Sequence, residues 1–233
     1  MNIPKRVMIL ILVFLFPMSL IALDKNTLWS AITFADNPVS TQEAMALAVA
    51  NPDILTEILF ISDFEKDNSV ARNNAVIILL SCSLNNVISQ AQFFNSVFSL
   101  LSRVEDYVHP SRLVAEKARI STTLGNYGFD SANNKFYLSL SDAFSSLITV
   151  IKSMQEKGLI KSSVLAKSLK TKIENAKKSY LKNSPGSVRA SVNQVEAALN
   201  ELSAQTGKHL SEEASLILNK FGTNIVTALN SLP

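Results

Sequence analysis

The side chains that could do acid–base, metal or nucleophilic chemistry are few and widely spaced in this sequence. Its two imidazoles are His109, before a proline, and His209, in a turn-like stretch, while its single thiol is Cys82. No His-Glu-x-x-His, Cys-x-x-Cys or EF-hand spacing gathers ligands for a metal ion. No Gly-x-Ser-x-Gly elbow occurs, and with six glycines the chain has no Gly-rich phosphate loop. We therefore expect no catalytic residue, no metal and no cofactor.

The spacing of the carboxylates also gives no indication of a catalytic site. The pairs Glu105-Asp106 and Glu212-Glu213 are adjacent in sequence, and adjacent residues on a helix do not face each other. They are typical of solvated faces and helix caps, so we expect the protein not to be an enzyme. The alternative is a cryptic enzyme with a site assembled from dispersed residues.

Cys82 stands inside the apolar segment AVIILLSCSL. One cysteine excludes an intramolecular disulfide, so stability has to come from packing. We expect a buried thiol that acts as a small apolar side chain. The alternatives are a reactive nucleophile or a disulfide between chains.

The strongest charge feature is a run of nine lysines between Lys152 and Lys182, opposed only by Glu156 and Glu174. Such a face either is simply solvated or contacts an anionic membrane or cell-wall polymer. No aromatic side chains alternate with these lysines, which argues against nucleic acid. The candidate contacts to an anionic surface are Lys167, Lys170, Lys177 and Lys178.

The chain begins with an export-type segment. Lys5 and Arg6 precede an apolar run over 7–23, which is typical of a secretory signal peptide, and the expected cut follows Ala22. Its loss lowers the net charge from +3 to +1, a balance that gives no reason to expect a nucleic-acid partner. The protein is then periplasmic or secreted. The alternative is an inner-membrane anchor formed by the uncleaved residues 7–23.

Scarce glycine and apolar residues three and four apart, without sustained alternation, predict an all-α fold. We expect a helical domain over 23–154 and a three-helix bundle over 155–233, with the boundary at the composition change near Gln155. In the first domain the predicted helical segments are 40–51, 53–64, 69–84, 91–108, 109–128 and 133–154. The bundle helices are expected at 162–182, at 188–205 and after Ser211.

Shifting the sequence by 44 positions lays similar residues on one another in the first domain. The matches are Val70-Ala71 on Val114-Ala115, Leu80 on Leu124, Ile54 on Phe98 and Phe60 on Val104. Over about 40–154 the pattern resembles HEAT-like helical repeats. The resemblance implies stacked helical hairpins, and an irregular, non-repetitive helical array is the alternative.

The last third resembles the FIMAH-type helical module over about 158–231. The matching residues are Gly158, Leu159, Leu165, Leu169, Ile173, Ala176, Ala190, Leu199, Gly207, Lys208, Leu210, Ala214 and Ile217. The stretch Ser-Pro-Gly between the first two helices departs from the family, which usually has a shorter polar turn there. The resemblance implies a non-catalytic accessory module of an exported bacterial protein.

Together these observations favour an exported, non-enzymatic bacterial protein that binds protein partners of the cell envelope or outside it. The alternative is a membrane- or envelope-associated structural protein held by the N-terminal segment, with peripheral contact through the lysine face.

Overall fold

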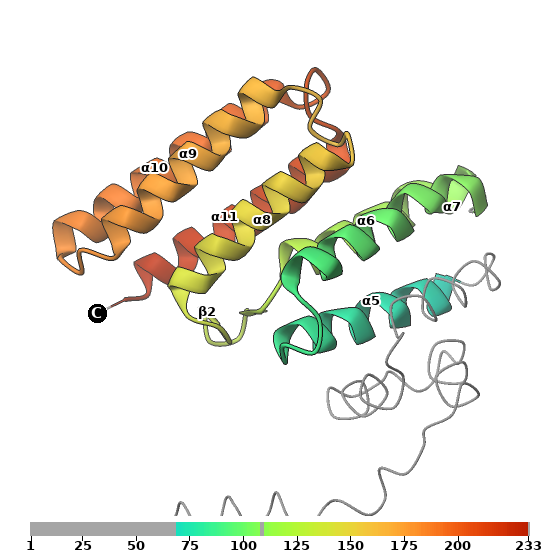
Figure 1. Ribbon diagram of the computed structural model, residues 1–233, viewed down its shortest axis with the longest axis horizontal. Coiled ribbons are helices and arrows are strands. Elements are labelled where there is room, and N and C mark those ends of the chain that lie inside the picture. The colour runs from blue at the N-terminus through green and yellow to red at the C-terminus, as the bar shows by residue number, and fades with distance from the viewer. Residues whose placement is uncertain (1–68, 108–109, 233) are drawn as a thin grey trace, which may run out of the picture.

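The computed structural model describes residues 69–107 and 110–232 (Figure 1). Within these residues the protein has seven helices and one two-stranded hairpin, packed as a helical bundle. The all-α prediction is therefore confirmed in its coarse form. The predicted signal segment and the helices predicted at 40–51 and 53–64 lie outside the described residues.

The first three described helices follow the sequence prediction closely. They are α5 (Ser69–Leu84), α6 (Gln90–Tyr107) and α7 (Pro110–Gly125), and each packs against the other two. Cys82, on α5, is fully buried, as predicted.

A small hairpin separates these helices from the next. Strand β1 (Phe129–Asp130) pairs antiparallel with β2 (Lys135–Phe136), and α8 (Leu140–Glu156) follows. The prediction of one helix over 133–154 was therefore wrong at its N-terminal end.

Local hydrogen bonds explain the hairpin. The Asp130 carboxylate accepts from the backbone N–H groups of Ala132 and Asn133, which closes the turn, and Asn134 takes a positive φ of 51°. The helix begins late because Ser139 is its N-cap, its side chain accepting from the backbone N–H of Asp142.

The C-terminal helices are α9 (Ser163–Tyr180), α10 (Pro185–Gln205) and α11 (Glu212–Asn230). Ser162 and Ser211 cap α9 and α11, and the helix start predicted after Ser211 is confirmed. Helix α10 begins at Pro185, three residues before the predicted start. Ser184 and Ser187 form a capping box there, and proline suits the first helical position.

Aromatic rings connect the first helices to the last one. The Tyr127 ring centroid lies 5.3 Å from that of Phe93 and 5.0 Å from that of Phe94 on α6. On its other side it lies 6.2 Å from the ring of Phe221 on α11. One buried apolar cluster thus extends from α5 to α11 across the position of the boundary predicted near Gln155.

Helix α11 packs against α7, α8 and α10 (Figure 1). Its contact with α7 is close because Gly125 has no side chain: a Cβ there would lie 2.6 Å from Cβ of Lys220 and 3.2 Å from the carbonyl of Ile217. Buried Asn224 donates to the Gly125 carbonyl and to Asn126 Oδ1, each at 3.1 Å. This contact between α7 and α11 is called the α7–α11 junction below.

We predict that Gly125→Ala destabilises the protein by about 1–3 kcal/mol, because its methyl group would overlap Lys220 and the α11 backbone. Gly186→Ala is the matched control. Gly186 lies in the first turn of α10, and a Cβ there meets nothing within 4 Å, so that change should be neutral or slightly stabilising. Urea unfolding measures both, and equal stabilities of the two variants would contradict the close packing.

The Cys82 thiol should be unreactive in the native protein. Burial raises the pKa of this thiol to about 11, so little thiolate forms at neutral pH and no reagent reaches it. Labelling with a thiol-specific chromogenic reagent should be complete in denaturant and proceed only at the rate of unfolding in buffer. Rapid stoichiometric labelling in buffer would show that α5 is open in solution.

Candidate functional site

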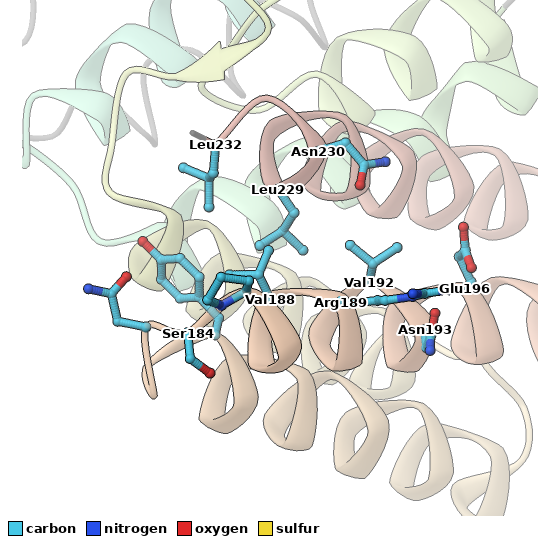
Figure 2. Close-up of a pocket in the computed structure, with 12 residues that line it drawn as sticks. Ser184, Val188, Arg189, Val192, Asn193, Glu196, Leu229, Asn230 and Leu232 are labelled. Carbon is cyan, nitrogen blue, oxygen red and sulfur yellow. The ribbon is translucent and has the colours of Figure 1, made fainter.

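A groove opens between the first half of α10 and the end of α11, and we call it the α10–α11 groove (Figure 2). Its cavity volume is about 740 Å³. The floor is apolar, with Tyr180 from the end of α9 and Leu229 from α11 among its residues. The lining residues are Tyr180, Asn183, Ser184, Pro185, Val188, Arg189, Val192, Asn193, Glu196, Leu229, Asn230 and Leu232.

The spacing of α10 and α11 explains where the groove lies. Midway along the pair, Gly222 lets Leu199 approach so closely that a Cβ at Gly222 would lie 2.6 Å from Leu199 Cδ2. Further along, Val188 and Val192 face the α11 end, and Figure 2 shows Val192 and Leu229 directed into the space between the helices. Short valine side chains leave this space unfilled, and both valines are half-buried.

Two opposite charges stand at the groove. Arg189 and Glu196 are exposed on α10, and neither makes an ion pair with the residues that the structure describes. Seven residues are about two helical turns, so the two positions lie roughly 10 Å apart along one face of the helix. Figure 2 shows the Arg189 side chain extended along the helix toward Glu196. An apolar floor with one cation and one anion at its rim is suited to binding a protein segment of complementary pattern.

The sequence prediction did not identify the groove. In the sequence, Val188 and Val192 share the helical spacing of Val195, which is fully buried, so the pattern does not separate groove residues from core residues. The available signal was the pair Arg189 and Glu196 flanking Val192 on one side of the helix. These two charges can be recognised as the rim of a groove only when the position of α11 beside α10 is known.

The four predicted surface lysines share one side of α9. At 100° per residue, Lys167, Lys170, Lys177 and Lys178 fall within an arc of roughly 100° that adjoins the arc of the buried residues, and Lys170 and Lys177 are themselves half-buried. Lys177 donates from Nζ to Ser145 Oγ on α8 at 2.6 Å. We call these four residues the α9 lysine face.

Lys172 is separate from the α9 lysine face. Its Nζ pairs with the Glu201 carboxylate on α10, and Ser168 donates to the same carboxylate oxygen. This lysine therefore serves the contact between α9 and α10.

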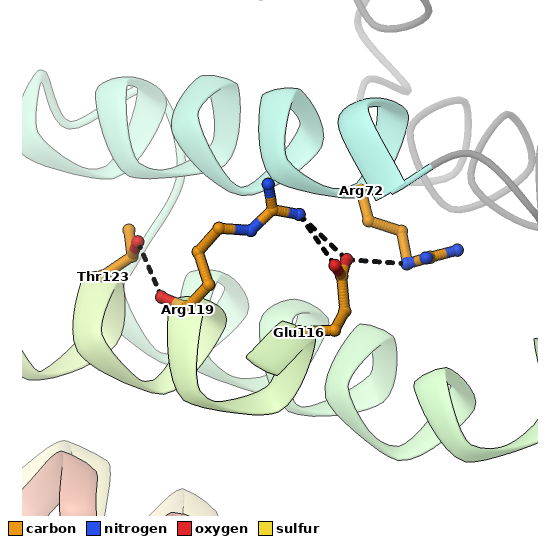
Figure 3. Close-up of polar contacts among 4 residues, drawn as sticks. All are labelled: Arg72, Glu116, Arg119 and Thr123. Carbon is orange, nitrogen blue, oxygen red and sulfur yellow. Dashed lines mark hydrogen bonds and ion pairs between the residues drawn. The ribbon is translucent and has the colours of Figure 1, made fainter. Parts of the chain in front are cut away.

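A buried ion cluster joins α5 to α7 (Figure 3). The Glu116 carboxylate accepts from Arg72 Nε at 3.1 Å and from Arg119 Nη2 at 3.0 Å to each oxygen. Arg72 is 3% exposed and Glu116 is 7% exposed. Because a buried charge is tolerated only with partners, this arrangement is a structural tie between two helices.

A second contact also joins residues 44 positions apart. Besides Arg72 and Glu116, the hydroxyl groups of Ser83 and Tyr127 lie 2.9 Å from each other. The two contacts lie at opposite ends of α5, so α5 and α7 run parallel. Burial raises the pKa of Tyr127, which keeps its hydroxyl protonated for this contact.

Lys117 on α7 and Glu213 in the first turn of α11 form a partly buried ion pair at 2.9 Å. Burial raises the pKa of Glu213, but the hydrogen bond and the positive charge of Lys117 lower it more, so the pKa lies below its ordinary value. The pair therefore strengthens the α7–α11 junction while Glu213 is ionised.

Chemistry-bearing side chains do not converge in the part of the chain that the structure describes. No group of three or more His, Cys, Asp or Glu residues there is placed to hold a metal ion. His209 is exposed in the turn before α11, and His109 lies outside the described residues. Of the helices described, none combines the length and the apolar character needed to cross a bilayer.

No family model, curated protein or solved structure matches this chain. The resemblances to HEAT-like repeats and to the FIMAH-type module therefore stay predictions.

The Glu213 pair predicts a pH dependence of stability. A lowered pKa in the folded state adds stability above the ordinary carboxylate pKa, and this stability is lost as the pH falls through the folded-state value. The free energy of unfolding should therefore decrease more steeply from about pH 5 to about pH 3 in the wild type than in Glu213→Gln.

Glu212→Gln is the matched control, because Glu212 is the exposed neighbour in the same helical turn. It should keep the wild-type slope in urea unfolding at each pH. The ion pair would be refuted as a source of stability if Glu213→Gln and Glu212→Gln gave the same pH dependence.

Proposed function

We propose that this chain is an exported, non-enzymatic bacterial protein that binds a protein partner in the α10–α11 groove. The observation that carries the proposal is the groove itself: an apolar floor open to solvent, with Arg189 and Glu196 unpaired among the described residues. Apolar surface in a groove rimmed by polar groups is the usual composition of a binding site for an amphipathic segment.

The construction of the groove favours binding. Its floor comes from three helices, α9, α10 and α11, so it exists before a partner arrives and little order has to be gained on binding. Glu196 is the only carboxylate among its lining residues, and the lining contains no histidine or cysteine. A paired acid and base, which most hydrolytic sites need, is therefore missing from the described lining.

We also propose that α5–α7 belong to a HEAT-like hairpin array. Two contacts between residues 44 apart, Arg72 with Glu116 and Ser83 with Tyr127, support this, because equivalent helices of successive repeats lie side by side. Val114 weakens the detailed match: it is 78% exposed, so it does not pack like a repeat-core residue.

The FIMAH-like assignment of α9–α11 is also a proposal. Buried Leu165, Leu169 and Ile173 on α9 and Ala214 and Ile217 on α11 support it, since they were the apolar positions of the resemblance. Export rests on the segment 7–23. An accessory module of this kind would recognise its partner through its outer faces and carry no reaction.

Site-specific photo-crosslinking in cells that make the protein tests the proposed function. A photo-reactive residue at exposed Asn193, beside the groove, should give one adduct of defined mass with a partner protein. The same residue at Ala204, exposed near the other end of α10, is the matched control and should not give this adduct.

The charge swap Arg189→Glu with Glu196→Arg should remove the Asn193 adduct while leaving helical content and thermal stability unchanged, because both side chains are exposed. Equal adducts at Asn193 and Ala204, or an Asn193 adduct that survives the swap, would refute the groove as the binding site.

A further inference from the structure

Helix α9 forms an edge of the bundle. It packs against α8 and α10, and Figure 1 shows α9 and α10 together at one side of the molecule. Its buried side is made by Leu165, Ala166, Leu169, Ile173 and Ala176. Beside this buried side lies the α9 lysine face, in which Lys167 and Lys178 are exposed and Lys170 and Lys177 are half-buried.

Most of the charge on this face is not neutralised. Lys167, Lys170 and Lys178 make no ion pair with any residue that the structure describes, and Glu174 is the one carboxylate on α9. Surface lysines that only improve solubility are usually interspersed with acids, which pair with them at three- or four-residue spacing. Glu174 stands among these lysines, four residues from both Lys170 and Lys178, but it forms no ion pair with either, and one carboxylate against four lysines leaves a net positive strip along the helix.

Exposed apolar residues stand at both ends of the strip. Val164, in the first turn of α9, is 77% exposed, and Leu181, directly after the helix, is 58% exposed. By the helical repeat both project from the outward half of α9. A helix of 18 residues is roughly 27 Å long, so the two apolar side chains bracket the lysines at about that distance.

We propose that the α9 lysine face docks on an anionic lipid bilayer, with α9 parallel to the membrane plane. The lysine ammonium groups pair with headgroup phosphates, and Val164 and Leu181 enter the interface between headgroups and acyl chains. The buried side of α9 belongs to the protein core, so the helix rests on the membrane and does not insert. This inference is independent of the α10–α11 groove.

The composition of the face favours lipid over nucleic acid. Helix α9 has no arginine, and its one aromatic residue, Tyr180, lies 6.0 Å from the ring of Phe144 on α8. No aromatic side chain on the outward side of α9 is therefore available to stack on bases. Exposed aliphatic residues beside lysines instead suit a surface that combines anionic headgroups with an apolar interior.

Vesicle binding of the full-length chain tests the proposal. Binding to vesicles of phosphatidylcholine mixed with phosphatidylglycerol should be stronger than to pure phosphatidylcholine, and the difference should fall as salt rises. The variant Lys167→Gln/Lys170→Gln/Lys178→Gln should lose about tenfold or more of its partitioning into the anionic vesicles. All variants are compared in the same form of the chain, so the difference between them reports on the substituted lysines.

The variant Lys135→Gln/Lys208→Gln/Lys220→Gln is the matched control. It removes the same charge from exposed lysines outside α9 and should retain most of the affinity. Equal losses in the two triple variants would overturn the proposal, because they would show an effect of net charge only.

Tryptophan fluorescence gives a second readout. With Trp29 changed to Phe so that the introduced ring is the one tryptophan, Leu181→Trp should shift to the blue on anionic vesicles. Leu216→Trp, at an exposed position of α11, should not. No shift at 181, or equal shifts at 181 and 216, would overturn the proposed orientation. Face-dependent binding to a soluble RNA that matches or exceeds the vesicle affinity would overturn the assignment to lipid.

Discussion

The structure depends on the α7–α11 junction, where two helices approach closely enough to bury Asn224. Gly125 permits the approach, and Asn224 uses it by donating to the Gly125 carbonyl and to Asn126. Buried side-chain hydrogen bonds of this kind contribute about 1 kcal/mol each, and more is lost when one partner remains unsatisfied. The junction therefore fixes α11, the helix that supplies Leu229 to the groove.

The surfaces proposed to bind lie away from this junction. The α9 lysine face lies on the helix pair at one side of the molecule, and the α10–α11 groove lies beside the C-terminal end of α11 (Figure 1). Buried charges such as Glu116 are fully paired and serve packing, whereas the charges at the proposed surfaces form no ion pair among the described residues. This division between paired interior charges and unpaired outer charges is the physical basis of both proposals.

Features set by residues close together in the sequence could be predicted, whereas features set by contacts between distant residues could not. The starts of α9 and α11 follow from local capping by Ser162 and Ser211, so they could be predicted. The hairpin could not, since its strands have two residues each and no alternation develops. The groove could not either, because the exposure of Val188 depends on how far α11 lies from α10. The 44-residue repeat was predicted from matching apolar residues. The contacts that the structure shows between residues 44 positions apart, such as Ser83 with Tyr127, are polar.

Native-state hydrogen exchange in increasing denaturant tests the central role of the α7–α11 junction most directly. If the junction holds the fold together, the slowest-exchanging amides of α7 and α11 should converge on one free energy of opening in the wild-type chain. If α11 kept its protection, together with α9 and α10, under conditions in which α7 had already opened, the account would be contradicted.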